Sequence, residues 1–450
     1  MKNFDLIAIG VGMAGNVAAR KCATAGWQVA VIDELPYGGT CALRGCDPKK
    51  MLRRGAEIID AAQLMKGKGV DPGGLAINWP ELMAHKRSFT EEMPDKIESG
   101  LDGAGVETLH GRARFLNENT IELADGTRLQ GEKFLIASGA RPRDLDFPGA
   151  EHVIDSTAFL ELDTLPKRVA FLGGGFVSME FAHIVARAGT SATVIDRGAR
   201  PLKNFDPDLV EMLVKRSAMA GIDIRTGTDV TGVRKTASGF TVVAAQDGAP
   251  VEIEADLVVH GAGRVPVIGH LDLAAAGIAF EDKGVSVRAH LQSTTQPHVY
   301  AAGDAAASPG QPLTPVAVFE GKVAASNMLN GTKKEPDYRG VPSVVFTVPE
   351  LARVGLLEEE AREQGLDVSV KYTDTSGWYS NLRVGETTAA AKVITDKATG
   401  KLVGAHLFGP EYGELINFFG LAMRLDLPGK ALRAMVAAYP SVGSDLGSML

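Results

Sequence analysis

The stretch DLIAIGVGMAG, residues 5–15, decides the fold, because a short buried strand runs directly into three glycines. A helix is expected from the last of these glycines to about Gly26, and a second strand over 28–32 ends at Asp33. Strand, glycine-rich turn, helix, strand and acid, in this order, form a dinucleotide-binding fingerprint. The glycines let the backbone approach a pyrophosphate at the helix start, and Asp33 can bind ribose hydroxyls.

The same pattern recurs at 169–196. It contains the turn Gly173-Gly174-Gly175, and Asp196 ends its second strand. Ser178 stands in place of the third glycine and is still small enough for close helix–strand packing. Two such units predict an α/β protein that binds two nucleotides.

The run GGTCALRGCDPKK, residues 38–50, follows the first unit and contains Cys41 and Cys46. A helix start is electropositive, and Arg44 and two lysines add charge, so a thiolate is favoured here. Two thiols beside a nucleotide predict a redox-active disulfide. Two buried structural cysteines or half of a metal site are the alternatives, but Cys22 is the only other cysteine and no histidine pair lies nearby. Arg44 could equally be a solvated surface residue.

Length and charge limit the function classes. A chain of 450 residues suggests about three domains. The formal net charge of −8 argues against a nucleic-acid or anionic-membrane partner. No apolar stretch approaches the roughly 18 residues of a membrane span, and the first residues lack a signal-peptide pattern. We therefore expect a cytoplasmic enzyme.

With these motifs, the chain resembles the class I pyridine nucleotide–disulfide oxidoreductases, the family of glutathione reductase, dihydrolipoamide dehydrogenase and mercuric reductase. The further segments that carry the resemblance are ASGARP (137–142), GAGRVP (261–266), YAAGD (300–304), LTPVA (313–317) and FTVPELARVG (346–355).

The resemblance implies two Rossmann-like, three-layer ββα nucleotide-binding domains and a C-terminal α+β dimerisation domain. The FAD-binding domain would cover 1–146 and 265–340, the NAD(P)H-binding domain 147–264, and the dimerisation domain 341–450. Within the last, strands are expected over 389–394 and 402–407, and a helix over 412–423. The protein would be a homodimer whose active site is shared between subunits.

The implied activity is an FAD-dependent NAD(P)H oxidoreductase. It would pass hydride through the flavin to a Cys41–Cys46 disulfide and on to a small disulfide or thiol-linked acceptor; a reductase of a metal ion or quinone-type oxidant is the alternative. By family position, Cys46 is the thiol nearer the flavin and Cys41 attacks the acceptor. Lys49 and Glu180 match the family's lysine–glutamate pair beside the flavin, although Glu180 could also be a helix acid stabilised by the dipole.

The resemblance also implies the cofactor-binding residues. For FAD they are Gly10, Gly12, Met13, Ala14, Gly15, Asp33, Glu34, Gly39, Thr40, Ala113, Ser138, Gly139, Arg264, Gly303, Asp304, Leu313, Thr314, Pro315 and Ala317. For the nicotinamide nucleotide they are Gly173, Gly175, Phe176, Val177, Asp196, Arg197, Lys203 and Gly263.

The residues that would distinguish NADPH from NADH give mixed indications. Asp196 stands where NADH enzymes carry an acid, and Arg197 and Lys203 stand where NADPH enzymes place two cations. Two cations outweigh one acid if both reach the 2′-phosphate, so NADPH is slightly favoured. Arg197 could instead pair with Asp196.

The C-terminal segment departs from the family. The disulfide reductases of the family end in His-Pro-x-x-x-Glu, and the histidine of this motif shuttles protons. Here Tyr439 replaces the histidine, Ser444 replaces the glutamate, and Asp445 comes one position late. Tyrosine is a poor base at neutral pH, and general acid–base help is typically worth about 10²–10⁴-fold. Mercuric reductase also has tyrosine here, but its C-terminal cysteine pair is missing; Tyr439 could also be a packed interface residue.

The residues expected to contact the electron acceptor match those of glutathione reductase only in part. Arg20 occupies a glutathione-contacting position, whereas Met13 and Lys322 depart from it. These changes favour an acceptor other than glutathione disulfide. Trp378 and Tyr379 could line an acceptor pocket, although packing is the simpler role.

Overall fold

The computed structural model describes residues 1–450. The chain forms two compact units. The first comprises 1–48, 85–143 and 264–338, and the second 49–84, 144–263 and 339–450. No helix is both long enough and apolar enough to cross a bilayer.

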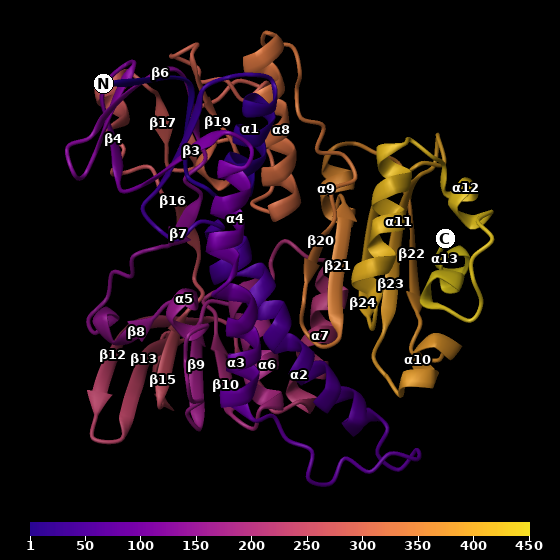
Figure 1. Cartoon of the computed structure of the whole chain (residues 1–450). Helices are drawn as coiled ribbons and strands as arrows, with labels where there is room; N and C mark the ends of the chain where they lie inside the picture. Colours follow the sequence, from indigo (N-terminus) through magenta and orange to yellow (C-terminus); the bar gives the residue numbers. More distant parts are fainter. The chain divides into compact units, whose positions relative to one another are not determined.

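The first unit contains a seven-stranded sheet of order β3-β2-β1-β6-β5-β4, with β19 paired to β6 (Figure 1). Its strands are β1 (Lys2–Ile9), β2 (Val29–Asp33), β3 (Val106–His110), β4 (Ala113–Asn117), β5 (Thr120–Leu123), β6 (Arg128–Ile136) and β19 (Val299–Ala301). Small two-stranded sheets pair β7 (Ala140–Pro142) with β16 (Arg264–Pro266), and β17 (Phe280–Glu281) with β18 (Gly284–Val285). The helices are α1 (Met13–Thr24), α4 (Met93–Asp102) and α8 (Thr314–Asn330), with short turns η1 (Thr40–Arg44), η3 (Leu273–Ala276) and η4 (Gly303–Ala305).

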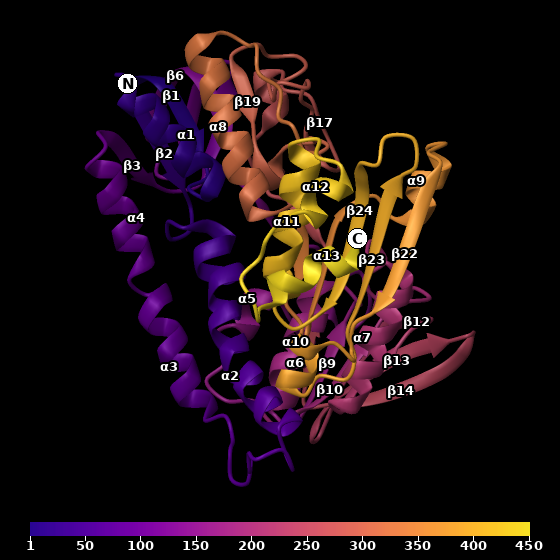
Figure 2. The ribbon, with the colours of Figure 1, turned by 90° about the vertical axis from the view of Figure 1, so that its right-hand side faces the viewer.

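Strand β1 explains why this sheet is covered on both faces. Successive side chains of a strand point to opposite faces. Leu6 and Ala8 join one apolar cluster with residues of α1 and α8, and Ile7 and Ile9 join a second cluster that lacks both helices. A strand buried on both faces reads as a continuous apolar run, as this one does. Helices α1 and α8 lie side by side (Figures 1 and 2).

The second unit contains the parallel sheet that carries the second glycine turn, and the C-terminal sheet. A five-stranded parallel sheet has the order β11-β10-β9-β15-β8. Its strands are β8 (Val153–Ile154), β9 (Arg168–Leu172), β10 (Ser191–Ile195), β11 (Ile222–Arg225) and β15 (Leu257–His260). An antiparallel meander of β12 (Thr228–Thr236), β13 (Gly239–Gln246) and β14 (Ala249–Ala255) accompanies it, with α5 (Ser156–Phe159), α6 (Phe176–Arg187), α7 (Pro207–Met219) and η2 (Ala150–His152). Helix α2 (Cys46–Leu64) begins at the end of the first unit and lies mostly in this one, and α3 (Trp79–Thr90) is also divided between the two ranges.

The C-terminal sheet is antiparallel, with the order β20-β21-β24-β23-β22. It consists of β20 (Ser343–Val345), β21 (Glu350–Gly355), β22 (Val368–Asp374), β23 (Ala390–Asp396) and β24 (Leu402–Gly409). Its helices are α9 (Glu358–Glu363), α10 (Tyr379–Val384), α11 (Tyr412–Arg424), α12 (Gly429–Arg433) and α13 (Leu446–Met449), with η5 (Val442–Asp445). Helix α11 packs on β21 and β24 (Figure 2). The predicted α/β class with two Rossmann-like parts and an α+β C-terminal part is confirmed; the exact domain boundaries stay predictions.

Candidate active site

The first glycine turn is shaped by close backbone approaches. Gly10 has φ +99°, and a Cβ there would lie 2.3 Å from the Ala137 carbonyl oxygen. A Cβ on Gly15 would lie 2.0 Å from the Gly10 carbonyl oxygen. Gly12 differs, since the nearest atom to a Cβ there is the Gly39 Cα at 4.0 Å. Two glycines therefore close the turn, and Gly12, just before α1, leaves room for a ligand.

Asp33 is held at the end of β2, facing this turn. The Val11 amide donates to Asp33 Oδ2 at 2.7 Å, and the Leu35 amide donates to Oδ1 at 3.0 Å. Burial raises the pKa of Asp33, and the two backbone bonds act against this rise. Each carboxylate oxygen has a further lone pair that can accept a ribose hydroxyl. The neighbouring Glu34 is exposed and pairs loosely with Arg112, at 3.9 Å.

The two predicted redox cysteines lie together at the start of α2. Gly39, with φ +63°, precedes a single π-helical turn over Thr40–Arg44, and α2 begins at Cys46. π-Helical turns are rare in proteins, and those that occur are often found at functional sites. The hydrogen bond with Cys46 is the main factor that raises the pKa of Cys41, and burial is the second. Cys46 is exposed, stands at the electropositive end of a 19-residue helix, and lies 3.4 Å from Thr314 Oγ1. Cys46 is therefore the better placed of the two to ionise, while Cys41 keeps its proton.

Arg44 ends the π-helical turn and is half-buried. Burial lowers its pKa, the charge of Asp33 acts against this, and the charge of Arg264 lowers the pKa further. Its charge therefore lies near Asp33, and its effect on a thiolate stays a prediction.

The start of α8 and the turn at 303–304 contain the remaining residues of the first unit that are predicted to bind FAD. Leu313 precedes α8, which opens with Thr314 and Pro315. A Cβ on Gly303 would lie 3.2 Å from the Ala317 Cβ and 3.7 Å from the Ala14 Cβ. Segments that are far apart in the sequence therefore meet here.

Arg264 connects this region to the cysteine turn. Its guanidinium donates to Thr40 Oγ1 at 3.3 Å and to the Ala140 carbonyl oxygen. Burial raises the pKa of Asp304, and the charge of Arg264 opposes the rise. The arginine therefore lies within electrostatic reach of the carboxylate that the family resemblance assigns to the flavin.

The residues of this unit fit a flavin nucleotide. Ser138 Oγ is inaccessible to solvent and has no hydrogen-bond partner in the chain, which is unusual for a buried hydroxyl. The adjacent Gly139 has φ +71° and open space where a Cβ would stand. Ala113 is buried at the start of β4, and Met13 begins α1. An unpaired donor, open glycines and two carboxylates, Asp33 and Asp304, match a ligand with phosphate and hydroxyl groups.

The second glycine turn repeats the first. Gly173 has φ +92°, and the Gly174 and Gly198 amides donate to the Asp196 carboxylate, the latter at 2.5 Å. Gly175 precedes α6, and a Cβ there would make an ordinary van der Waals contact with the Gly261 carbonyl oxygen at 3.5 Å. The loop after Asp196 is tied back, because the Leu202 amide donates to the Gly174 carbonyl oxygen at 2.8 Å.

Arg197 and Lys203 are exposed on this tied loop. The Asp196 carboxylate is held by backbone amides rather than by Arg197, so the arginine stays available to a ligand. Gly263, with φ +111°, also has open space around its Cα.

Lys49 and Glu180 form an ion pair with both side chains buried. Glu180 also accepts from the Phe346 amide at 2.9 Å, and the Lys49 ammonium lies 5.2 Å from the centre of the Phe176 ring. Glu180 lies in the second turn of α6, after Phe176 and Val177, so it is not simply an acid at the helix N-terminus.

The C-terminal segment does not pair Tyr439 with Asp445. Asp445 accepts a hydrogen bond from Ser380 of α10, and Ser444 donates to the Ser441 carbonyl oxygen at 2.5 Å. Tyr439 is 80% exposed and lines a small hollow with Tyr379. Trp378 packs against the cluster around α11 and β24 instead.

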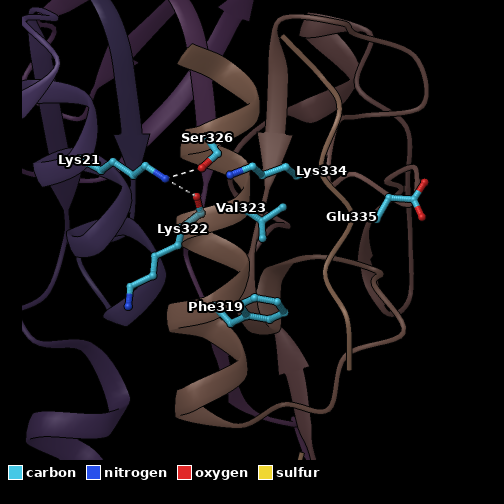
Figure 3. A pocket seen from close by; sticks show the side chains of 7 residues that line it. All are labelled: Lys21, Phe319, Lys322, Val323, Ser326, Lys334 and Glu335. Carbon is cyan, nitrogen blue, oxygen red and sulfur yellow. Dashed lines mark hydrogen bonds between the residues drawn. The ribbon is translucent and has the colours of Figure 1, made fainter. Parts of the chain in front are cut away.

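A larger hollow of about 370 Å³ lies between α1 and α8 (Figure 3). Lys21 donates across it to the Lys322 carbonyl oxygen at 3.1 Å and to Ser326. Lys322 itself is exposed on the same helix. Arg20, one residue before Lys21, donates to Asn16 at 2.9 Å.

Sequence reasoning missed Glu320, which is buried in α8 and accepts from the Gly303 amide at 2.6 Å. The available signal was weak: Glu320 is the only acid in a largely apolar helix. A lone acid in such a helix needs buried partners.

Comparisons with known proteins agree along the whole chain. A family model described as pyridine nucleotide-disulphide oxidoreductase matches residues 4–321, and the dimerisation-domain model of the same family matches 341–449. A mercuric reductase from Bacillus cereus is 32% identical, over 99% of this chain and 70% of that protein. A glutathione reductase from a Nostoc species is 30% identical, over 99% of each. The solved structure of the Cu(II) complex of the HOCl-induced flavoprotein disulfide reductase RclA from Escherichia coli matches with TM-score 0.88 and 28% identity, over 100% of this chain and 99% of that one.

Proposed function

Because the chain belongs to the pyridine nucleotide-disulphide oxidoreductase family, we propose that its Cys41–Cys46 pair reduces a small disulfide or thiol-linked acceptor. The family consists of FAD-dependent oxidoreductases that use NAD(P)H as the electron donor. The dimerisation domain supports a homodimer.

The observation that carries the proposal is the placement of two free thiols together at the start of α2, with the exposed Cys46 sulfur 3.4 Å from Thr314 Oγ1. Bound FAD supplies the two-electron chemistry that links nicotinamide to sulfur. The helix N-terminus and Thr314 favour an ionised Cys46, while Cys41 holds the proton that the acceptor needs.

The thiol steps conserve atoms and electrons. Cys41 passes its proton to the Cys46 thiolate, and the Cys41 thiolate that forms attacks one sulfur of the acceptor disulfide. The acceptor S–S bond breaks, a mixed disulfide forms on Cys41, and the departing thiolate takes the proton from Cys46. The Cys46 thiolate next attacks the Cys41 sulfur and displaces the second half of the acceptor as a thiolate, which takes its proton from the solvent. The Cys41–Cys46 disulfide that remains has lost the two electrons that the acceptor gained.

Lys49 and Glu180 keep their family role in this proposal. Lys49 follows Cys46 by three residues in the same helix, so both point to one side of its first turn. The buried partner Glu180 holds the ammonium in place.

Tyr439 takes the place of the proton-shuttling histidine in a site shared between subunits. Its ring is exposed on a single chain and is therefore open to a second copy. A phenol can donate a proton but is a weak base at neutral pH. We expect slower disulfide turnover than a histidine would give, by up to about 10²–10⁴-fold.

NADPH is the donor that we assign. The exposed Arg197 and Lys203 lie on a loop tied to the second glycine turn, and Asp196 is already held by backbone amides. Two cations beside a 2′-phosphate outweigh one carboxylate that is engaged elsewhere.

A second candidate is the reduction of a thiophilic metal ion. An exposed thiol beside a second thiol suits a soft ion, and such an acceptor needs less proton transfer from Tyr439. The similar RclA structure is a Cu(II) complex, and several relatives are mercuric reductases.

One experiment separates the candidates. NADPH oxidation by the purified protein is measured with oxidised glutathione, bis-γ-glutamylcystine, Hg(II), Cu(II) and a quinone. We expect turnover with a disulfide, lost in Cys41→Ser and in Cys46→Ser while FAD stays bound. Turnover with a metal ion alone selects the second candidate. Turnover that neither cysteine variant changes, with any acceptor, rules out both.

A further inference from the structure

Glu320 lies in the middle of α8 with 1% of its surface exposed, and three donors converge on it. The Gly303 amide donates to Oε2 at 2.6 Å. The Ser308 and Tyr338 hydroxyls both donate to Oε1, each at 2.6 Å. A buried carboxylate is tolerated only where hydrogen bonds replace its water, and here all its bonds lead to residues outside α8.

The Gly303 bond is the one that bears on the cofactor. Gly303 has φ +68° and directly precedes Asp304, whose carboxylate is buried near Arg264. A backbone amide can only donate, and Glu320 supplies the acceptor for this half-buried N–H. The turn is also packed between Ala14 and Ala317, which leaves it little room to find another partner.

We propose that Glu320 is a positioning residue for flavin binding: by accepting the Gly303 amide, it fixes the turn that presents Asp304 to FAD. The role is independent of the acceptor and of the thiols. It goes beyond the proposed function, because it concerns how the cofactor is held.

The hydrogen bond, rather than the charge, is the active part of this proposal. Burial raises the pKa of Glu320, and its three hydrogen bonds act against this rise. We therefore expect a neutral side chain that keeps these bonds to replace the carboxylate. A glutamine can turn its oxygen to the Gly303 amide and its NH₂ to the two hydroxyls, which can accept as well as donate.

Four variants of the full-length protein test the proposal. FAD affinity is measured by reconstituting apoprotein, and the flavin absorption spectrum is recorded for each holoenzyme. Glu320→Gln should bind FAD within about threefold of the wild type with an unchanged spectrum. Glu320→Ala should weaken binding by roughly tenfold or more, because the half-buried Gly303 amide loses its acceptor and the turn that carries Asp304 is no longer held. Ser308→Ala and Tyr338→Phe remove the other two bonds but keep the Gly303 bond, and should bind FAD normally.

Glu320→Asp covers the case in which the alanine variant does not fold. It keeps the charge but is one methylene too short to reach the Gly303 amide, so it should weaken FAD binding as alanine does, with a shifted flavin spectrum. Normal affinity in Glu320→Asp or Glu320→Ala overturns the proposal. So does equal weakening in Glu320→Gln, which would make charge the cause, or in the Ser308 and Tyr338 variants, which would make general packing the cause.

Discussion

Replacing Asp60 by alanine should destabilise the second unit by about 3–4 kcal/mol. Asp60 lies in α2, and its carboxylate is shared by two buried arginines. Arg187 donates to Oδ1 at 2.7 Å, and Arg216 donates to Oδ2 at 2.7 Å. The side chains of all three residues are at most 10% exposed.

The magnitude follows from what each arginine retains. A hydrogen bond between charged groups is worth about 1.5–3 kcal/mol, and breaking a buried ion pair costs about 3–5 kcal/mol. Arg216 keeps an ion pair with Glu386 at 3.2 Å, and Arg187 keeps a bond to the Val348 carbonyl oxygen at 3.0 Å. These remaining partners place the cost at the lower end of the range. Asp60→Asn keeps the volume and one acceptor, and should cost about half as much.

Urea denaturation followed by tryptophan fluorescence measures the effect, since Trp79 packs in the same apolar cluster as Leu52 and Ala56 of α2. Asp223→Asn is the matched control, because Asp223 pairs with Arg225 at 2.8 Å on the surface and such pairs contribute about 0–1 kcal/mol. A loss of unfolding free energy below about 1 kcal/mol in Asp60→Ala would show that the buried network does not anchor α2. Equal losses in Asp60→Asn and Asp223→Asn would show the same.

Three further predictions concern the site. Iodoacetamide should alkylate the reduced protein at Cys46 in preference to Cys41, because Cys46 is exposed, whereas the hydrogen bond with Cys46 and burial raise the pKa of Cys41. Equal labelling of the two cysteines near neutral pH, measured by peptide mapping, contradicts this. Lys203→Gln should raise the KM for NADPH by about tenfold and leave the KM for NADH within about threefold of the wild type. An equal rise in both KM values would place the lysine away from the 2′-phosphate. Gly10→Ala should abolish FAD binding, since its Cβ would meet a carbonyl oxygen at 2.3 Å, whereas Gly26→Ala, with φ +92° but no atom within 4 Å, should keep FAD; loss in both would show a general backbone effect.

Local patterns predicted the two nucleotide turns well, because their chemistry is local. Each turn needs glycines where the chain folds back on itself, and an acid at the end of the next strand. The Val11 amide binds Asp33 and the Gly174 amide binds Asp196 in the same way. The C-terminal helix expected over 412–423 is also found, as Tyr412–Arg424.

Contacts between distant residues could not be predicted in this way. Asp60 meets Arg187 and Arg216 across 127 and 156 residues, and no periodicity joins such positions. Lys49 and Glu180 were paired only through the family resemblance. The place of Arg44 between the two cysteines gave no sign that the charge of Asp33, at the end of β2, would also act on it.

The two glycine turns differ in what packs against them. Both bind an acid through a backbone amide, and at both helix starts a Cβ would make no contact shorter than 3.5 Å. In the first turn, however, a Cβ on Gly39 would lie 2.8 Å from the Gly12 Cα. This approach brings the segment that contains Cys41 directly against the cofactor turn, and any side chain at position 39 would push it away. The two glycines, one from each segment, therefore allow the close approach that places Cys41 beside the first turn.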